Sequence, residues 1–282
     1  MEYRYKGESV HSTILPWLVY KFGKPNMVMA EVGVWDGTSF KLYIEMLKEL
    51  KGHVYLVDWW KGSKEVSDGL NMEWKGEQYD DIYQKVQDLI DDHDARDYVT
   101  ILKGDSTKMA EHIKDGELDL CFIDADHSYE GCKRDIETYL PKVKKGGVMS
   151  GDDMDAAHGI YSFLSLAGTY TPEELSMDAV EGKGHPGVLQ AVYDVFGDNV
   201  HPYEEGWYTF AEHRIVRADI GIAPEENSSF LTASIEELSN NPELGKALQD
   251  NTSILHGGPR LLRSGTGWHE VIPHNWQTDF HK

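Results

Sequence analysis

Acidic residues follow two apolar segments of this sequence, at the points where strands of a sheet would end. The first segment, LDLCFI, is followed by Asp124 and Asp126, and the second, GGVMSG, by Asp152 and Asp153. Because neighbouring parallel strands end at one edge of a sheet, these carboxylates should gather where open α/β sheets bind ligands. Carboxylates so close together repel one another unless a cation is present. The sequence therefore predicts a site for a hard metal ion, a cationic ligand, or both.

A glycine-containing turn precedes these acids in the chain. The segment from Glu31 to Ser39 reads EVGVWDGTS, and its glycines, Gly33 and Gly37, let the backbone turn tightly and approach a ligand. The turn opens a helix whose N-terminal N–H groups, with the hydroxyl of Thr38, can donate to a carboxylate or a phosphate. The spacing differs from the G-x-G-x-x-G of dinucleotide-binding proteins, so the turn alone is equally typical of an ordinary strand-to-helix connection.

Polar residues also follow the next two predicted strands. Asp58 ends the second strand, where nucleoside-binding α/β folds use an acid to accept hydrogen bonds from ribose hydroxyls. Asp105 and Ser106 follow the third strand, where a polar side chain can meet an adenine edge; a solvated loop acid is the alternative for Asp105. A glycine turn followed one strand later by Asp58 indicates a nucleoside more strongly than either feature alone.

Alternating strands and helices are needed to bring these residues together. Short apolar runs do alternate with longer amphipathic ones, which is typical of βαβ units in an α/β fold. The strands are predicted at 28–32, 53–57, 98–102, 118–123 and 147–150, the helices at 38–50, 81–90, 131–140 and 188–196, and a closing hairpin at 200–203 and 207–216.

Three segments do not fit this alternation. Residues 59–79 and 155–186 are polar or rich in Gly, Thr and Pro, and should lie above the ligand edge of the sheet, where lids and substrate loops belong. The tail from 218 to 282 includes a plausible helix at 235–248. We therefore expect one domain over residues 1–217 with two loop insertions, and an extension over 218–282 that could supply a lid or a homo-oligomeric contact.

The composition argues against several kinds of partner. The chain has 27 Lys and Arg against 49 Asp and Glu, a formal net charge of -22. Such a field repels phosphate backbones and anionic membranes, so neither a nucleic acid nor a membrane is the expected partner. Two cysteines are too few for a disulfide framework, and no signal peptide or membrane-spanning run is apparent. We expect a cytoplasmic protein.

Together these motifs resemble the class I S-adenosylmethionine-dependent methyltransferases. Within that class the chain resembles the metal-dependent small-molecule O-methyltransferases: the catechol and caffeoyl-CoA enzymes and the macrocin-type sugar enzymes. The most specific feature is DADHSYEG followed by the GGV strand that ends in an acid pair, and the resemblance covers roughly residues 27–216. It implies a Rossmann-like fold with a mostly parallel seven-stranded sheet, an antiparallel closing hairpin and helices on both faces.

The resemblance also implies a role for each motif. The methionine end of the cofactor would lie against the glycine turn, the ribose against Asp58 and the adenine against Asp105 and Ser106, with Asp124 between the cofactor and a metal ion. The residues implied to bind S-adenosylmethionine are Glu31, Gly33, Gly37, Ser39, Asp58, Asp105, Ser106 and Asp124.

The family's metal ligands correspond to Asp124, Asp152 and Asp153. The family often has Asp-Asn where this chain has two aspartates, so the site carries an extra negative charge. Oxygen ligands of this kind suit Mg²⁺ or Mn²⁺. The implied reaction is the methylation of a hydroxyl on a small molecule, such as a sugar, a polyketide or a catechol-like diol, with the metal lowering the pKa of that hydroxyl.

His127 takes the place of a lysine that the catechol and caffeoyl-CoA enzymes use to deprotonate the substrate hydroxyl. A histidine is a reasonable general base near neutral pH, and a hydrogen-bonded structural histidine is the alternative. His158 and Asp155, just beyond the acid pair, are second candidates for the base.

Other functions that proteins of the same fold carry out stay open. A nicotinamide-dependent oxidoreductase should carry G-x-G-x-x-G after the first strand, and this chain does not. A non-catalytic binding protein would have no need of the acids together with His127. The nearest alternative is an N-methyltransferase or a metal-independent relative, in which Asp152 and Asp153 would bind substrate.

Overall fold

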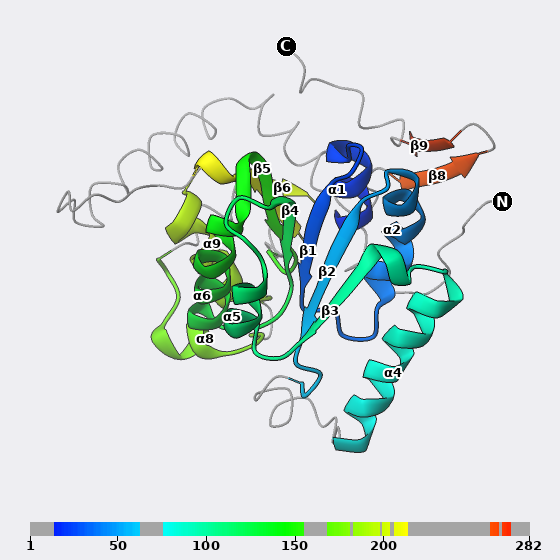
Figure 1. Ribbon diagram of the computed structural model, residues 1–282. Helices are drawn as coiled ribbons and strands as arrows, with labels where there is room; N and C mark the ends of the chain where they lie inside the picture. Colours follow the sequence, from blue (N-terminus) through cyan, green and yellow to red (C-terminus); the bar gives the residue numbers. More distant parts are fainter. Residues whose placement is uncertain are drawn as a thin grey trace, which may run out of the picture.

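A mixed β-sheet organises the molecule (Figure 1). The structure, a computed structural model, describes residues 14–62, 76–154, 168–180, 183–197, 199–203, 206–213, 260–264 and 267–271. Within these residues, seven strands join in the order β3-β2-β1-β4-β5-β7-β6. The strands are β1 (Val28–Val32), β2 (His53–Asp58), β3 (Val99–Lys103), β4 (Leu118–Ile123), β5 (Val143–Gly151), β6 (His201–Tyr203) and β7 (Gly206–Phe210).

The first five strands are parallel, and the last two close the sheet antiparallel. Strand β1 lies between β2 and β4, so the chain builds one half of the sheet outward from β1 and then crosses to build the other half from β4. Strand β7 pairs antiparallel with both β5 and β6. The predicted fold class is thereby confirmed. The carboxyl ends of β1 and β4 lie at the switch between the two halves, where open α/β sheets bind ligands.

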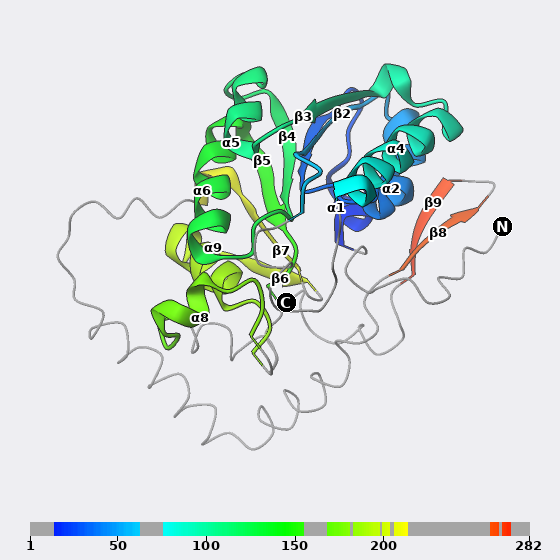
Figure 2. The same cartoon turned by 90° about the horizontal axis from the view of Figure 1, so that it is seen from below.

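Helices cover both faces of the sheet, as Figure 2 shows. Helices α1, α2 and α4 lie on one face, and α5, α6 and α9 lie on the other. The bounds are α1 (Ile14–Phe22), α2 (Thr38–Glu49), α4 (Gly76–Asp92), α5 (Ser106–Met109), α6 (Tyr129–Tyr139), α8 (Pro172–Ser176) and α9 (Pro186–Phe196). Short 3₁₀ turns are η2 (Arg96–Tyr98), η3 (Ala110–His112), η4 (Leu140–Lys142) and η5 (Ala211–His213).

Each face of the sheet has its own hydrophobic core, because alternate residues of a strand point to opposite sides. Met29 and Phe122 are buried against the helices α1 and α2, whereas Val32 and Ile123 are buried against α6 and α9. Both central strands are therefore largely apolar on both sides, and their acids, Glu31 and Asp119, each lie one residue from a strand end. This arrangement fixes β1 and β4 rigidly under the ligand edge.

Most predicted elements are present with shifted ends. Helix α4 begins at Gly76 instead of residue 81, and β5 begins at Val143 instead of 147. Strand β7 ends at Phe210 and continues into η5, so the predicted strand 207–216 is too long. Helix α1 has no counterpart among the predicted elements. Its sequence, ILPWLVYKF, is apolar at nearly every position and so lacks a helical period, and its proline lies in the first turn, where a helix tolerates it.

Several sequence-based expectations fall outside the described residues. They include the helix predicted at 235–248, residues 63–75 of the first insertion and residues 155–167 of the second. In the extension, β8 (Arg260–Ser264) and β9 (Gly267–Val271) form an antiparallel hairpin, and β8 lies close to α1. The domain boundary at residue 217 stays a prediction. No described helix has the length and apolar character needed to cross a membrane.

Candidate functional site

A cavity of about 550 Å³ opens at the carboxyl ends of β1, β2, β3 and β4. Its volume is within the range of small-molecule sites, roughly 300–1,000 Å³. Its walls come from the four loops that follow these strands, together with residues of α6 and one residue of the second insertion. The lining residues that bear on function are Gly33, Trp35, Asp58, Trp59, Asp105, Ser106, Asp124, Asp126, His127, Arg134, Asp135 and Asp178.

The glycine turn after β1 needs its glycine for two reasons. Gly33 has a φ of +92°, a backbone conformation that side chains rarely adopt. A Cβ atom at this position would lie only 1.6 Å from the carbonyl oxygen of Asp124, because the turn crosses directly over the end of β4. The glycine turn and the acidic loop after β4 are therefore in direct backbone contact on one wall of the cavity.

The Asp58 carboxylate holds this turn in place. Its Oδ2 accepts hydrogen bonds from the backbone N–H groups of Val34 and Trp35, both at 2.9 Å, and its Oδ1 accepts one from the N–H of Trp60 at 2.6 Å. Asp58 also lines the cavity. Its predicted contact with ribose hydroxyls stays a prediction, and its three backbone contacts give it a structural role that the sequence did not reveal.

Glu31 lies behind the turn and not on the cavity wall. It is fully buried, and its two carboxylate oxygens accept hydrogen bonds from the hydroxyls of Ser39 and Tyr43. Burial raises the pKa of Glu31 to about 8, with a further increase from the charges of Asp124 and Asp58, although the two hydroxyl hydrogen bonds lower it. Glu31 and Ser39 thus contact each other within the fold, and their predicted contact with the cofactor stays a prediction.

A buried acid that the sequence did not single out lies at the end of the cavity predicted to hold adenine. Asp135 of α6 is 1 % exposed, and its Oδ1 accepts a hydrogen bond from the hydroxyl of Ser106 at 2.7 Å. Its Oδ2 has no hydrogen-bond partner among the described residues. Burial raises the pKa of Asp135 to about 6. Asp105 accepts hydrogen bonds from Thr107 and from the N–H of Lys108, so it caps helix α5 beside this end of the cavity.

His127 lies among three carboxylates at the opposite end of the cavity. Its Nε2 is 3.0 Å from Asp153 Oδ2 and 3.5 Å from Asp124 Oδ1, and its Nδ1 is 3.0 Å from Asp178 Oδ1. Burial alone would lower the pKa of His127, but the three carboxylates outweigh burial and hold the pKa well above its usual range. These surroundings therefore favour the protonated form of the ring. The carboxylates that the sequence places here are compensated in part by this residue.

A second histidine joins this cluster. His185 precedes α9, and its Nδ1 lies 3.5 Å from Asp153 Oδ1. The rings of His127 and His185 meet edge to face, with centroids 5.0 Å apart. One potential ligand atom from each of His127, Asp153 and His185 lies within 4.8 Å of the other two, a spacing that could hold a metal ion.

The three acids predicted as metal ligands are not equivalent in the structure. Asp124 and Asp153 both approach His127, whereas Asp152 is 3 % exposed and its Oδ1 accepts the backbone N–H of Asp153 at 3.0 Å. Among the described residues, the group with metal-ligand spacing contains Asp153 and two histidines, but neither Asp124 nor Asp152. The other candidate bases, at positions 155 and 158, lie outside the described residues.

Sequence reasoning missed Asp178 and His185 because both belong to the 155–186 segment, which matched no known pattern. His185 directly precedes a proline at the start of α9, a signal for a helix start that carries no information about a ligand. Asp178 lies two residues after α8. The described part of this insertion therefore reaches the ligand edge of the sheet and contributes charged groups to it.

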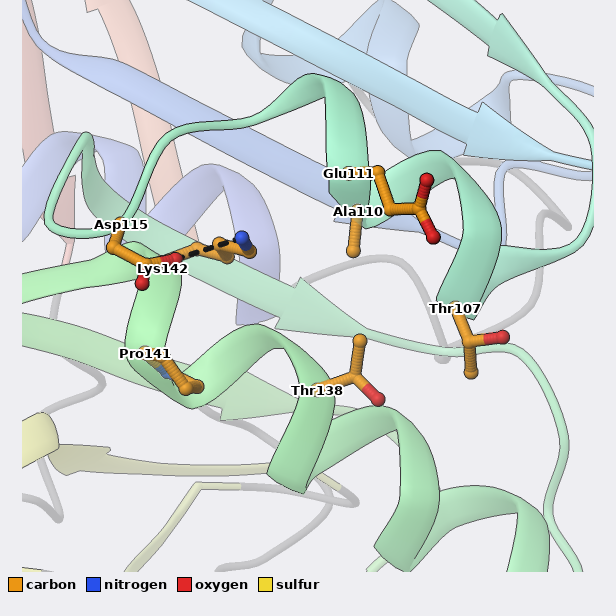
Figure 3. A pocket seen from close by; sticks show the side chains of 7 residues that line it. All are labelled: Thr107, Ala110, Glu111, Asp115, Thr138, Pro141 and Lys142. Carbon is orange, nitrogen blue, oxygen red and sulfur yellow. Dashed lines mark hydrogen bonds and ion pairs between the residues drawn. The ribbon is translucent and has the colours of Figure 1, made fainter.

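A smaller hollow of about 230 Å³ lies between the α5–η3 and α6–η4 segments (Figure 3). Lys142 and Asp115 form an ion pair of 2.7 Å across one end of it. Its other lining side chains are Thr107, Ala110, Glu111, Thr138 and Pro141. It shares no lining residue with the large cavity and groups no nucleophile or metal-ligating set, so the large cavity is the candidate functional site.

Residues 30–154 match a protein family described as "Methyltransferase domain". The matched region begins in β1 and ends just after the acid pair, so it contains the glycine turn, Asp58 and His127. It excludes Asp178 and His185. A comparison with curated proteins found no match.

Solved structures with a similar chain path include several methyltransferases. The O-methyltransferase NovP shares 17% identity, with 70% of this chain and 76% of that chain covered and a TM-score of 0.45. CalS11, a TDP-rhamnose 3'-O-methyltransferase of calicheamicin biosynthesis, shares 14% identity with the same coverages and TM-score. A Staphylococcus aureus protein assigned as a caffeoyl-CoA O-methyltransferase shares 16% identity, with 69% of this chain and 79% of that chain covered and a TM-score of 0.46.

Proposed function

We propose that this chain is an S-adenosylmethionine-dependent methyltransferase that methylates a hydroxyl oxygen on a small molecule. The match of residues 30–154 to a methyltransferase domain supports the first part of this proposal. One observation carries the proposal: the same cavity is lined by the glycine turn and Asp58, where the nucleoside is predicted to bind, and by carboxylates together with His127. The two parts of such a reaction, a cofactor site and a site that can make an oxygen nucleophilic, therefore share one cavity.

The cofactor would lie along the glycine turn. Bound S-adenosylmethionine supplies a methyl group on a sulfonium, an electrophile that needs no further activation. The chain's own task is then to hold the reacting atoms in line and to exclude water. The rigid backbone contact of Gly33 with Asp124 fixes the distance between the turn and the acidic loop, and Asp58 fixes the N–H groups of the turn. Asp105, Ser106 and Asp135 are the polar groups available to the adenine.

A divalent cation fits the other end of the cavity. Asp124 and His127 line this end of the cavity, and carboxylate oxygens of Asp124 and of Asp153, which is not a lining residue, lie 3.5 Å and 3.0 Å from His127 Nε2. All three side chains are partly or largely buried. The oxygen donors suit the expected Mg²⁺ or Mn²⁺. When bound, such an ion supplies Lewis acidity that makes a nearby hydroxyl easier to deprotonate. Asp152, next to Asp153 in the sequence, is a further buried carboxyl group.

His127 is the residue predicted to take the hydroxyl proton. Both of its ring nitrogens face carboxylates in the structure, so the base role requires a neutral ring with one nitrogen turned toward the substrate. The general-base role therefore stays a prediction. The acceptor is proposed to be a small hydroxylated molecule and not a nucleic acid, because the formal net charge of -22 opposes a phosphate backbone.

The proposal is tested by incubating the full chain with methyl-labelled S-adenosylmethionine, Mg²⁺ or Mn²⁺, and a panel of catechols, sugar nucleotides and polyketide alcohols. Mass spectrometry of the product locates the new methyl group. Label on an oxygen of one acceptor class supports the proposal. Label on nitrogen alone, or transfer only to RNA, would replace it by an N-methyltransferase or a nucleic-acid enzyme on the same fold.

A further inference from the structure

We propose that His127, Asp153 and His185 bind one first-row transition metal ion, in preference to Mg²⁺. The inference deepens the proposed function, on which its catalytic meaning rests, but ion binding itself can be measured without methyl transfer. It assigns a ligand role to His185, which lies outside the matched methyltransferase region, and it changes the character of the site from an all-oxygen set to a mixed nitrogen and oxygen set.

The spacing of the three groups suits a common ion. Ligand atoms that all lie within 4.8 Å of one another have a common centre no more than about 2.8 Å from each of them. Metal–imidazole and metal–carboxylate bonds in proteins are about 2.0–2.2 Å long. Side-chain movements of less than about 1 Å would therefore bring the three atoms to bonding distance, with no change in the backbone of β5 or α9.

The surroundings of His127 are those of a metal-binding imidazole. Its two ring nitrogens are buried, and neither forms a well-aligned hydrogen bond within the described residues, although carboxylate oxygens lie 3.0 Å from each of them. Asp178 faces Nδ1, and Nε2 faces Asp153. A carboxylate on the far nitrogen is the usual partner of a histidine that ligates a metal, because it fixes the ring and raises its basicity.

The donor types decide which ion is preferred. Mg²⁺ favours oxygen ligands and water, whereas imidazole suits Fe²⁺, Co²⁺, Ni²⁺ and Zn²⁺. Two imidazoles and one carboxylate leave further positions for water or substrate, and Asp124, 3.5 Å from His127, lies beside them. A nitrogen whose lone pair holds the ion cannot accept a proton, so His127 is a ligand and not the base in the metal-bound protein.

The experiment uses untagged, full-length protein stripped of metal with a chelator. Co²⁺ is the probe, because its visible absorption reports nitrogen and oxygen ligation directly, and equilibrium dialysis with elemental analysis gives the stoichiometry. We expect about one Co²⁺ per chain, bound about tenfold or more tightly than Mg²⁺. His185→Ala and His185→Gln should each weaken Co²⁺ binding by about tenfold or more, and Asp178→Asn should weaken it by a smaller factor.

His201→Ala is the matched control, since His201 is exposed on β6 and stacks on Tyr208. This variant should bind Co²⁺ as the unaltered chain does. The proposal is overturned if the unaltered chain takes up no Co²⁺, if equimolar Mg²⁺ displaces it, or if both His185 variants keep the original affinity and spectrum. Should Co²⁺ bind as described while no methyl transfer is found with any acceptor, the metal site stands and the proposed function fails.

Discussion

Glu31 gives a sharp test of the buried electrostatics beneath the site. The carboxyl is fully buried, and its pKa is raised from 4.5 to about 8, mainly because burial disfavours the charged form. The folded chain therefore holds this proton more strongly than the unfolded chain does. As pH rises from about 4.5 to about 8, the unfolded state releases the proton while the folded state keeps it. The free energy of unfolding then falls with rising pH, by about 1 kcal/mol per pH unit from this one group.

The perturbation is Glu31→Gln. A glutamine has the same shape, is neutral at every pH, and can still accept from Tyr43 and donate to Ser39. Urea denaturation of both proteins at several pH values between 5.5 and 7.5 gives the free energies of unfolding. The free energy of unfolding of the variant, relative to that of the unaltered chain, should rise by about 1 kcal/mol for each pH unit in this interval. Near pH 8 the variant should be more stable to unfolding than the unaltered chain by a few kcal/mol in total. This figure allows for rearrangement of the folded chain around a charged Glu31, which reduces the difference.

Glu111→Gln is the control, because Glu111 is an exposed carboxylate on η3 and the chemical change is the same. Its free energy of unfolding should follow the pH dependence of the unaltered chain. Equal slopes for the unaltered chain and Glu31→Gln would refute the reasoning, since they would mean that Glu31 titrates alike in the folded and unfolded states.

Three further outcomes follow from the site. Gly33→Ala should lower the free energy of unfolding by about 3 kcal/mol or more in urea titrations. Gly116 also has a positive φ but no atom within 4 Å of the new Cβ, so Gly116→Ala should lower the free energy of unfolding by only about 1 kcal/mol. Equal losses for the two variants would contradict the close contact of Gly33 with Asp124. Asp58→Ala should weaken the binding of S-adenosylhomocysteine about ten- to hundredfold by calorimetry, and unchanged affinity would exclude Asp58 from the site. Prolonged chelation should reduce methyl transfer about hundredfold or more, and a divalent ion should restore it; persistent full activity would instead favour the metal-independent alternative.

The alternation of strands and helices was accessible to sequence reasoning because the central strands are apolar on both faces, whereas the order of the strands in the sheet comes from the structure. Runs such as VMAEV and LDLCFI can be buried only between two helical layers, and acids directly after them must lie at the strand ends. Helix α1 was not accessible, since a short helix that is buried nearly all round has no polar face to reveal its period.

The candidate site was predictable only where a residue follows a strand. Gly33, Asp58, Asp124 and His127 line the cavity for this reason. Glu31 differs because it is the fourth of five residues in β1, and its side chain turns inward to Ser39 and Tyr43.

Residues contributed by insertions or by later helices could not be located in the same way. Asp178 and His185 reach the site through an insertion whose path depends on tertiary packing, and Asp135 reaches it from the middle of α6. No local spacing in the sequence reports these long-range approaches. Asp178 and His185 change the chemical character of the cluster around His127, because they add a carboxylate and an imidazole to the predicted acids.

The most direct test of the central claim, that the cavity is an S-adenosylmethionine site, is isothermal titration calorimetry of the full chain. S-adenosylhomocysteine should bind with one site per chain and a dissociation constant in the micromolar range, and NAD⁺ should give no heat under the same conditions. Heat from NAD⁺ together with none from S-adenosylhomocysteine or S-adenosylmethionine would contradict this claim, and would make the glycine turn and Asp58 parts of a dinucleotide site.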